Sequence, residues 1–105
     1  MANPHAGEVE IVLDDERHVM RLTLGVLAEL EAELGEVSLV DLIARFEGGA
    51  VSSRDVLRLI VAGLRGGGWR GRMDDLLAVE IAGGPLEAAR LAGELLVRAF
   101  ARPGT

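Results

Sequence analysis

The chain has no cysteine and no lysine. Without cysteine it can form no disulfide bond, no thiolate metal site and no cysteine nucleophile. Without lysine it has no Schiff-base chemistry and no ammonium group of the kind that phosphate-binding loops use. All 11 basic residues are arginines. These absences remove several common routes to catalysis, and we expect a protein that is not an enzyme.

Aromatic residues are scarce as well, since Phe46, Trp69 and Phe100 are the only ones among 105 residues. The core must therefore consist of leucine, valine, isoleucine and alanine, which favours packed helices over a β-sandwich. Little aromatic surface is left for stacking on bases. The net charge of −6 also opposes binding to a polyphosphate backbone. We therefore expect no nucleic-acid partner.

Long apolar runs are missing too. The longest, residues 59–64, is far shorter than the roughly 20 residues of a membrane-spanning helix. Residues 1–7 have neither the basic nor the apolar segment of a signal peptide. We therefore expect a cytoplasmic protein with no membrane partner. A chain of this length has room for one core, so residues 1–105 are interpreted as a single domain with flexible ends at 1–7 and 101–105.

Alternating apolar and polar residues predict a β-hairpin near the start of the chain. Two strands are expected, over residues 8–13 and 17–22, with a polar turn at 14–16. Every second residue of the first strand, from Val9 to Leu13, lies on one apolar face. A lone hairpin is marginal in water, so this face must pack on helices or on another subunit.

Helical spacing of apolar residues predicts four or five helices after the hairpin, and hence an α+β, mostly α, fold. The expected helices cover residues 24–34, 39–47, 54–65, 74–79 and 85–100. Each expected helix starts at a residue of a type that favours helix starts. These residues are Thr23, Ser38, Ser52 or Ser53, Asp74 and Pro85. The apolar residues placed on inward faces include Leu24, Leu86 and Phe100. Glu87, Arg90, Glu94 and Arg98 have the spacing of a solvent-facing stripe with pairs of opposite charge.

The third expected helix, residues 54–65, is apolar on more than one face. Such a helix lies at the centre of a fold or is covered by a partner. An excess of apolar helical surface over what one small core needs usually marks a protein-binding face. The alternative, that the chain packs all of this surface into its own core, stays open at this point. The residues expected to contact a partner are Leu57, Ile60, Val61, Leu64 and Trp69.

The glycine-rich segment 66–71 allows three interpretations. It fits a flexible loop between helices, or a loop that contacts a partner through Trp69 and its arginines. It could also hold an anion, with Arg65, Arg70 and Arg72 nearby, but the sequence lacks the preceding strand and the Gly-Lys-Ser/Thr of a phosphate-binding loop.

Candidate catalytic and metal-binding residues are few. His5 and His18 have no partner ligands at usable spacing. Ser52 and Ser53 have no histidine near them in the sequence to act as a base, so they are interpreted as helix caps. The acidic run at residues 14–16 is interpreted as a solvated turn. We expect no catalytic residues, no metal site and no cofactor.

Several motifs occur in an order typical of one family. They are Gly7-Glu-Val-Glu leading into a strand, Asp14-Asp15 at the hairpin turn, the leucine- and glutamate-rich segment 22–35, Leu42-Ile-Ala-Arg-Phe-Glu-Gly-Gly, Ser53-Arg-Asp-Val, and Ala62-Gly-Leu-Arg. Taken together, they resemble the small tail-assembly proteins of gene transfer agents and related siphophage-like clusters, which are grouped with phage tail assembly chaperones. The family more often has glycine where this chain has Asp15.

This resemblance implies a tail assembly chaperone of a gene transfer agent or prophage, with no catalytic residues. Its expected partners are the tape-measure protein and the tail tube protein. The alternative is a structural minor component of the tail. A tube subunit is disfavoured because one hairpin provides too little sheet to close a ring. Whether the chain forms a homo-oligomer is left open.

Overall fold

The computed structural model describes residues 7–35 and 37–100. These form β1 (Val9–Leu13), β2 (Glu16–Met20), α1 (Leu24–Leu34), α2 (Leu39–Gly48), α3 (Ser53–Gly66), α4 (Met73–Leu77) and α5 (Gly84–Ala99). The predicted hairpin followed by four or five helices is therefore confirmed. Apart from Gly7, the expected flexible ends lie outside the described residues, and so does His5.

The hairpin is tighter than the sequence pattern predicts. β1 and β2 pair antiparallel, with Leu13 opposite Glu16 and Val9 opposite Met20. Glu16 was predicted to be part of the turn, but it begins β2. Only Asp14 and Asp15 remain in the turn, with φ angles of 47° and 68°. Two consecutive positive φ angles are typical of the type I′ turn, whose twist matches that of the paired strands.

Asp15 is a site where one substitution should stabilise the fold. We expect Asp15→Gly to raise the free energy of unfolding by about 0.5–1 kcal/mol, because glycine adopts a positive φ without the steric strain of a Cβ atom. Urea denaturation of both proteins measures this difference. An unchanged or lower stability would contradict the assigned turn geometry.

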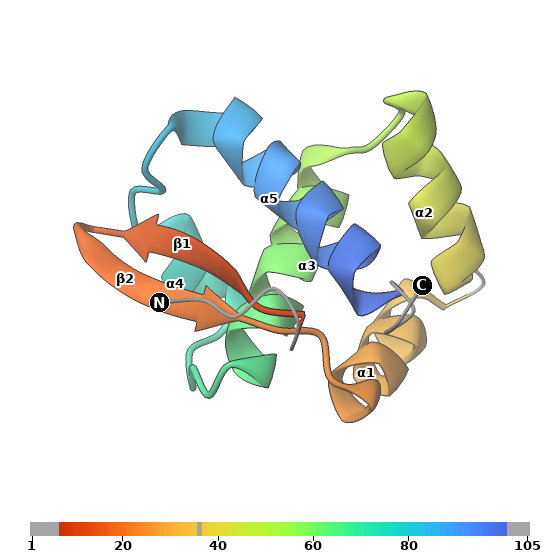
Figure 1. Cartoon of the computed structure of the whole chain (residues 1–105), viewed down its shortest axis with the longest axis horizontal. Coiled ribbons are helices and arrows are strands. Elements are labelled where there is room, and N and C mark those ends of the chain that lie inside the picture. The colour runs from red at the N-terminus through yellow and green to blue at the C-terminus, as the bar shows by residue number, and fades with distance from the viewer. Residues whose placement is uncertain (1–6, 36, 101–105) are drawn as a thin grey trace.

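α3 lies at the centre of the molecule (Figure 1). It contacts α5, β2, α1 and α4, and its side chains of Leu59, Ile60 and Leu64 are fully buried. The hairpin covers one side of α3, whereas α1 and α2 lie toward the other side. The apolar face of the hairpin is buried, with Ile11 and Met20 at most 1% exposed. The central position accounts for the apolar residues on more than one face of α3.

Two serine caps set the starts of α2 and α3. Ser38 and Ser52 each accept a hydrogen bond from the backbone N–H three residues later, and the side chains of Asp41 and Asp55 accept one from the cap backbone. Both helices thus begin with a capping box in which aspartate replaces the usual glutamate. Of the two predicted caps for α3, Ser52 fills the role, and Ser53 is the first helical residue.

The start of α4 differs from the prediction. Asp74 was predicted to be its cap, but Arg72 occupies the cap position. The Asp75 carboxylate accepts a hydrogen bond of 2.8 Å from the Arg72 backbone N–H. The helix is also shorter than expected and ends at Leu77, so residues 78–83 form a separate connecting segment.

Some apolar residues predicted to face inward lie on the surface. The exposed fractions are 85% for Leu24, 87% for Leu86 and 49% for Phe100. On α5, Leu95 packs against Gly63 of α3, and a period of 3.6 residues places Leu86, nine residues earlier, on the opposite side of the helix. The helices therefore carry more apolar surface than this core covers.

The glycine-rich segment after α3 is not a flexible loop in its first half. Gly66 is the last residue of α3, and Gly67 is its C-terminal cap. A Cβ atom on Gly66 would lie 1.8 Å from the Arg21 carbonyl oxygen, and one on Gly67 would lie 1.8 Å from the Val19 carbonyl oxygen. The Arg21 N–H also donates to the Gly63 carbonyl, at 2.8 Å. The backbone of β2 and the residue after it therefore packs directly on the end of α3, which only glycine allows.

Candidate functional site

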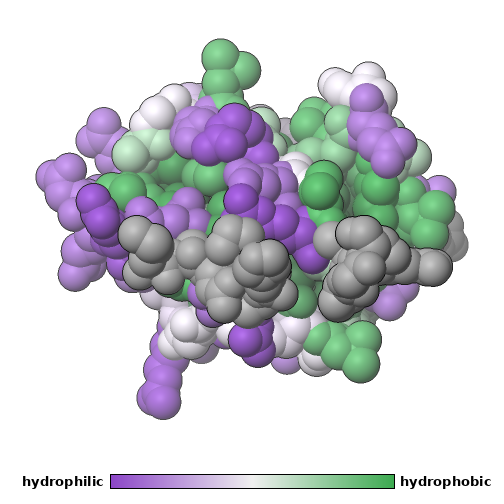
Figure 2. Space-filling model, viewed as in Figure 1, coloured by the Kyte–Doolittle hydropathy of each residue, from purple (hydrophilic) through white to green (hydrophobic). Residues whose placement is uncertain are grey.

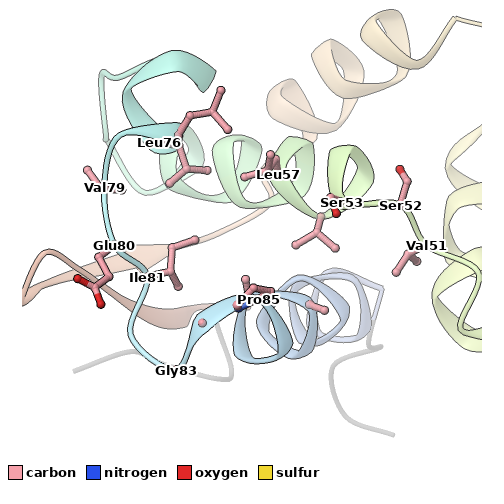
Figure 3. Close-up of a pocket in the computed structure, with 15 residues that line it drawn as sticks. Val51, Ser52, Ser53, Leu57, Leu76, Val79, Glu80, Ile81, Gly83 and Pro85 are labelled. Carbon is pink, nitrogen blue, oxygen red and sulfur yellow. The ribbon is translucent and has the colours of Figure 1, made fainter.

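A groove of about 600 Å³ opens between the start of α3, α4, residues 78–83 and the start of α5 (Figure 3). Most of its lining is aliphatic. The lining residues are Val51, Ser52, Ser53, Val56, Leu57, Leu76, Leu77, Val79, Glu80, Ile81, Gly83, Gly84, Pro85, Ala88 and Ala89. We call this surface the α3–α5 groove.

Hydrogen bonds to the hairpin hold one wall of the groove in place. The backbone of residues 80–82 runs beside the end of β1, where the Asp14 N–H donates to the Glu80 carbonyl, at 2.9 Å, and the Ala82 N–H to the Val12 carbonyl, at 3.0 Å. The Asp14 carboxylate also accepts a hydrogen bond of 2.9 Å from the Glu80 N–H. Val79 and Ile81 are therefore fixed at the rim without belonging to a helix.

The opposite wall begins at a sharp backbone bend. Gly83 and Gly84 have φ angles of 88° and 73°, a conformation that residues with a side chain rarely adopt. Pro85 follows in the first turn of α5, where its missing N–H leaves no broken helical bond. The bend places Pro85 across the groove from Leu57 of α3 (Figure 3).

The groove has little polar chemistry. Its ionisable lining residue is Glu80, and its hydroxyl groups belong to Ser52 and Ser53. The Ser52 hydroxyl accepts a hydrogen bond of 3.1 Å from the Asp55 backbone N–H, as a helix cap. Among the described residues that line the groove there is no histidine. Such a surface can take up an apolar segment of another chain.

The described residues offer no metal cluster and no membrane span. Within residues 7–35 and 37–100, no three histidine, aspartate or glutamate side chains gather where they could hold a metal ion. No helix in that part of the chain is both long and apolar enough to cross a bilayer. Arg65, one of the arginines considered for anion binding, faces Glu29 of α1 at 3.9 Å.

The five predicted contact residues lie in different parts of the structure, some at the surface and some in the core. Leu57 lines the α3–α5 groove. Val61 lies on the side of α3 that faces α1, and Trp69 is half-buried beside Gly71. Ile60 and Leu64 are 0% exposed, so a partner cannot reach them in this conformation. Their apolar pattern reflects the central position of α3.

A short helix was predicted where α4 lies, but the groove wall that α4 forms with residues 78–83 was not predicted. Leu77, Val79 and Ile81 alternate with smaller or polar residues, which is the period of a strand. Ile81 does form a single antiparallel bridge with Leu13 of β1. This alternation was the available signal, but it is too short to predict a strand without the hairpin beside it.

A second apolar surface lies along α5. A hollow of about 500 Å³ between α2 and α5 is lined by Ile43, Phe46, Glu47, Ala89, Arg90, Gly93, Leu96, Val97 and Phe100. Val97 in this lining is 70% exposed, and Leu86, at the start of the same helix, is 87% exposed. Figure 2 shows a hydrophilic band over α5 with hydrophobic side chains between this band and α2.

The hydrophilic band is the predicted stripe of opposite charges. Arg90 forms ion pairs with Glu87, at 2.6 Å, and with Glu94, at 3.1 Å. Arg98 also forms an ion pair with Glu94. The hydrogen bond from Arg90 holds the pKa of Glu87 below its usual value, and Glu87 in turn raises the pKa of Arg90. Both side chains therefore stay charged at neutral pH.

Residues 6–102 match the family described as "Phage tail tube protein, GTA-gp10". No curated protein and no solved structure matches the chain. The family match covers both strands, all five described helices and both apolar surfaces. The chain therefore belongs to the phage tail tube protein, GTA-gp10, family of phage and gene transfer agent tail components.

Proposed function

We propose that the protein is a minor structural component of a phage-like tail, of a gene transfer agent or a prophage. It joins the tail by binding an apolar segment of another tail protein in the α3–α5 groove, without catalysis, metal or cofactor. The observation that carries this proposal is the open aliphatic groove in a chain of a tail-protein family. The candidate partners are the tail tube protein and the tape-measure protein.

The groove has the properties of a recognition surface. Each Å² of apolar surface that a partner buries there contributes about 25 cal/mol. One wall is hydrogen-bonded to the hairpin and the other is the start of a 16-residue helix, so little ordering is needed on binding. An amphipathic helix or an apolar strand of the partner fits such a surface.

A second candidate function is that of a tail assembly chaperone. The observation that favours it is the size of the sheet, which has two strands and one isolated bridge among the described residues. The wall of a tube requires a larger sheet to close a ring. A chaperone would instead bind the tape-measure protein in the cytoplasm through the same groove and leave before the tail is complete.

Quantitative mass spectrometry of purified particles distinguishes the two functions. A structural component is expected at a fixed ratio to the tube protein. A chaperone is expected to be absent or far below that ratio, yet to copurify with the tape-measure protein from lysates. Absence from particles together with failure to copurify with either tail protein would overturn both.

Leu77 provides a direct test of the groove. It lines the groove, and it is 62% exposed, so Leu77→Arg should leave the fold intact. We expect this change to weaken copurification of the tail partner by about tenfold or more, as for a hydrophobic anchor of an interface. Titration of the purified partner, followed by calorimetry, measures the loss.

Leu24→Arg is the matched control for this test. Leu24 is 85% exposed on α1 and does not line the groove. The same change of chemistry there should leave partner affinity unaltered. Equal losses in the two variants would show that the groove is not the binding surface.

A further inference from the structure

We propose that the outer face of α5 pairs, antiparallel, with the same face of a second copy of this chain, in a twofold dimer that crosses near Gly93. This surface is separate from the function proposed for the α3–α5 groove, with which it shares only Ala89. The proposal rests on two features of α5 that become complementary when the helix is reversed.

The first feature is an apolar seam. Leu86, Gly93 and Phe100 are spaced seven residues apart, and Val97 lies between the last two. Side chains with this spacing form one continuous stripe on a helix. Leu86 and Val97 are at least 70% exposed and Phe100 is 49% exposed. The seam therefore has large side chains at its ends and a glycine at its centre.

The glycine lets a second helix approach closely at the middle of the seam. Gly93 has no Cβ atom, and one added there would contact Phe46 of α2, at 3.6 Å, so a second helix reaches Gly93 from the hollow beside Phe46. A helix crossing antiparallel at this point places Leu86 of one copy opposite Phe100 of the other, because each lies seven residues from Gly93. Both ends of the seam are then covered by the same contact, as twofold symmetry requires.

The second feature is the order of charges beside the seam. Along α5 the stripe reads Glu87, Arg90, Glu94 and Arg98. Read in the opposite direction, the stripe has the order Arg, Glu, Arg, Glu. Each acid of one copy is therefore opposite a base of the other copy, and each base is opposite an acid. The charges thus match an antiparallel copy of the same helix, in which the two stripes lie on the same side of the seam and face each other.

The oppositely charged residues of the two copies also lie at similar heights along the helix axis. Arg90 lies three residues before Gly93, and Glu94 lies one residue after it. In an antiparallel pair crossing at Gly93, Arg90 and Glu94 of the second copy are about 3 Å apart along the axis, at a rise of about 1.5 Å per residue. By the same count, Arg98 and Glu87 of the second copy differ by about 1.5 Å along the axis.

This self-complementarity singles out a second copy as the occupant. A different partner helix would match the seam and the stripe equally well only if it carried the same pattern of opposite charges in reverse order, together with a small residue at its centre. The chain itself supplies both in α5. The dimer leaves the α3–α5 groove open to a tail protein.

The mass of the full chain in solution, measured by light scattering during size-exclusion chromatography, tests the dimer. We expect twice the monomer mass of 11.1 kDa. Val97→Arg should weaken self-association by about tenfold or more by placing a charge in the seam. Leu77→Arg, which changes the groove instead, should leave the mass at that of the dimer. A wild-type monomer at millimolar concentration would overturn the proposal.

A charge-exchange pair tests the antiparallel register. Arg90→Glu places acid against Glu94 of the second copy, and Glu94→Arg places base against Arg90 of the second copy. Each variant alone should self-associate at least about tenfold more weakly than wild type. A mixture of the two should form a heterodimer with recovered affinity, because all facing pairs are then of opposite sign.

The mixture distinguishes charge repulsion across the seam from unfolding of either variant. Circular dichroism spectra of each variant should stay native, since exposed helical ion pairs contribute only a few tenths of a kcal/mol each. Failure of the mixture to associate would contradict the register. Loss of tail-protein binding by Leu77→Arg, with the dimer intact, would show that the groove and the seam are independent surfaces. Association of the seam with a tail protein instead of a second copy would overturn the choice of occupant.

Discussion

Replacing Gly67 with alanine is expected to lower the free energy of unfolding by about 3 kcal/mol or more. The added Cβ atom would lie 1.8 Å from the Val19 carbonyl oxygen and 2.9 Å from its carbonyl carbon. Neither atom belongs to a flexible side chain, so the clash can be relieved only by moving β2 away from α3. Because β2 packs on α3 through Met20, such a shift would also open the core. Urea denaturation measures the loss.

Gly25 provides the matched control. It lies in the first turn of α1, and a Cβ atom added there would meet no atom within 4 Å. Gly25→Ala should raise the stability by about 0.5–1 kcal/mol, because alanine has the higher helix propensity. If both alanines had the same effect, the close approach of β2 to the end of α3 would be wrong.

Asp55→Ala is expected to lower the free energy of unfolding by about 2–3 kcal/mol. Asp55 is only 4% exposed, and its carboxylate accepts hydrogen bonds from the Ser52 backbone N–H, at 3.3 Å, and from Arg45, at 3.2 Å. Alanine removes both acceptor contacts at the first turn of the central helix. It also removes the contact with Arg45, which links α2 to α3.

Asp41→Ala gives the comparison within the same motif. Asp41 occupies the same position of the α2 capping box, but it is exposed, and its carboxylate accepts from the Ser38 backbone N–H at 3.2 Å. Its loss should lower stability by only about 0.5–1 kcal/mol. A double-mutant cycle of Asp55→Ala with Arg45→Ala separates the contribution of the ion pair from that of the cap. Equal effects of the two aspartates would contradict the buried link between α2 and α3.

The local elements of the fold were predictable because local residues determine them. Val9, Ile11 and Leu13 recur at every second residue, as the inward face of a half-buried strand requires. Thr23, Ser38 and Ser52 accept the cap hydrogen bonds that the sequence predicts. These signals depend on neighbours within four residues. The hairpin, the helix order and the charged stripe of α5 follow from them.

Contacts between distant segments could not be predicted in this way. The tight packing of Gly66 and Gly67 depends on Arg21 and Val19, more than 40 residues earlier in the chain. A run of glycines alone is equally typical of a flexible loop. In the same way, the outward position of Leu86 follows from which face of α5 meets α3, and helical periodicity alone does not define that face when both carry leucine.

The candidate site was predicted only in part for the same reason. Leu57 does line the groove, but Leu76, Ile81 and Pro85 complete it from segments that are remote in sequence. The sequence indicated an excess of apolar surface without showing where it lies. The structure places it in the α3–α5 groove and along the outer face of α5.

Binding of a tail protein in the α3–α5 groove is the central claim, and amide hydrogen exchange of the complex tests it most directly. The chain would be measured alone and bound to the tail protein that copurifies with it. We predict slower exchange on binding in residues 51–57 and 76–89, and unchanged exchange in α1. Protection confined to α1, or no protection in either groove segment, would contradict the claim.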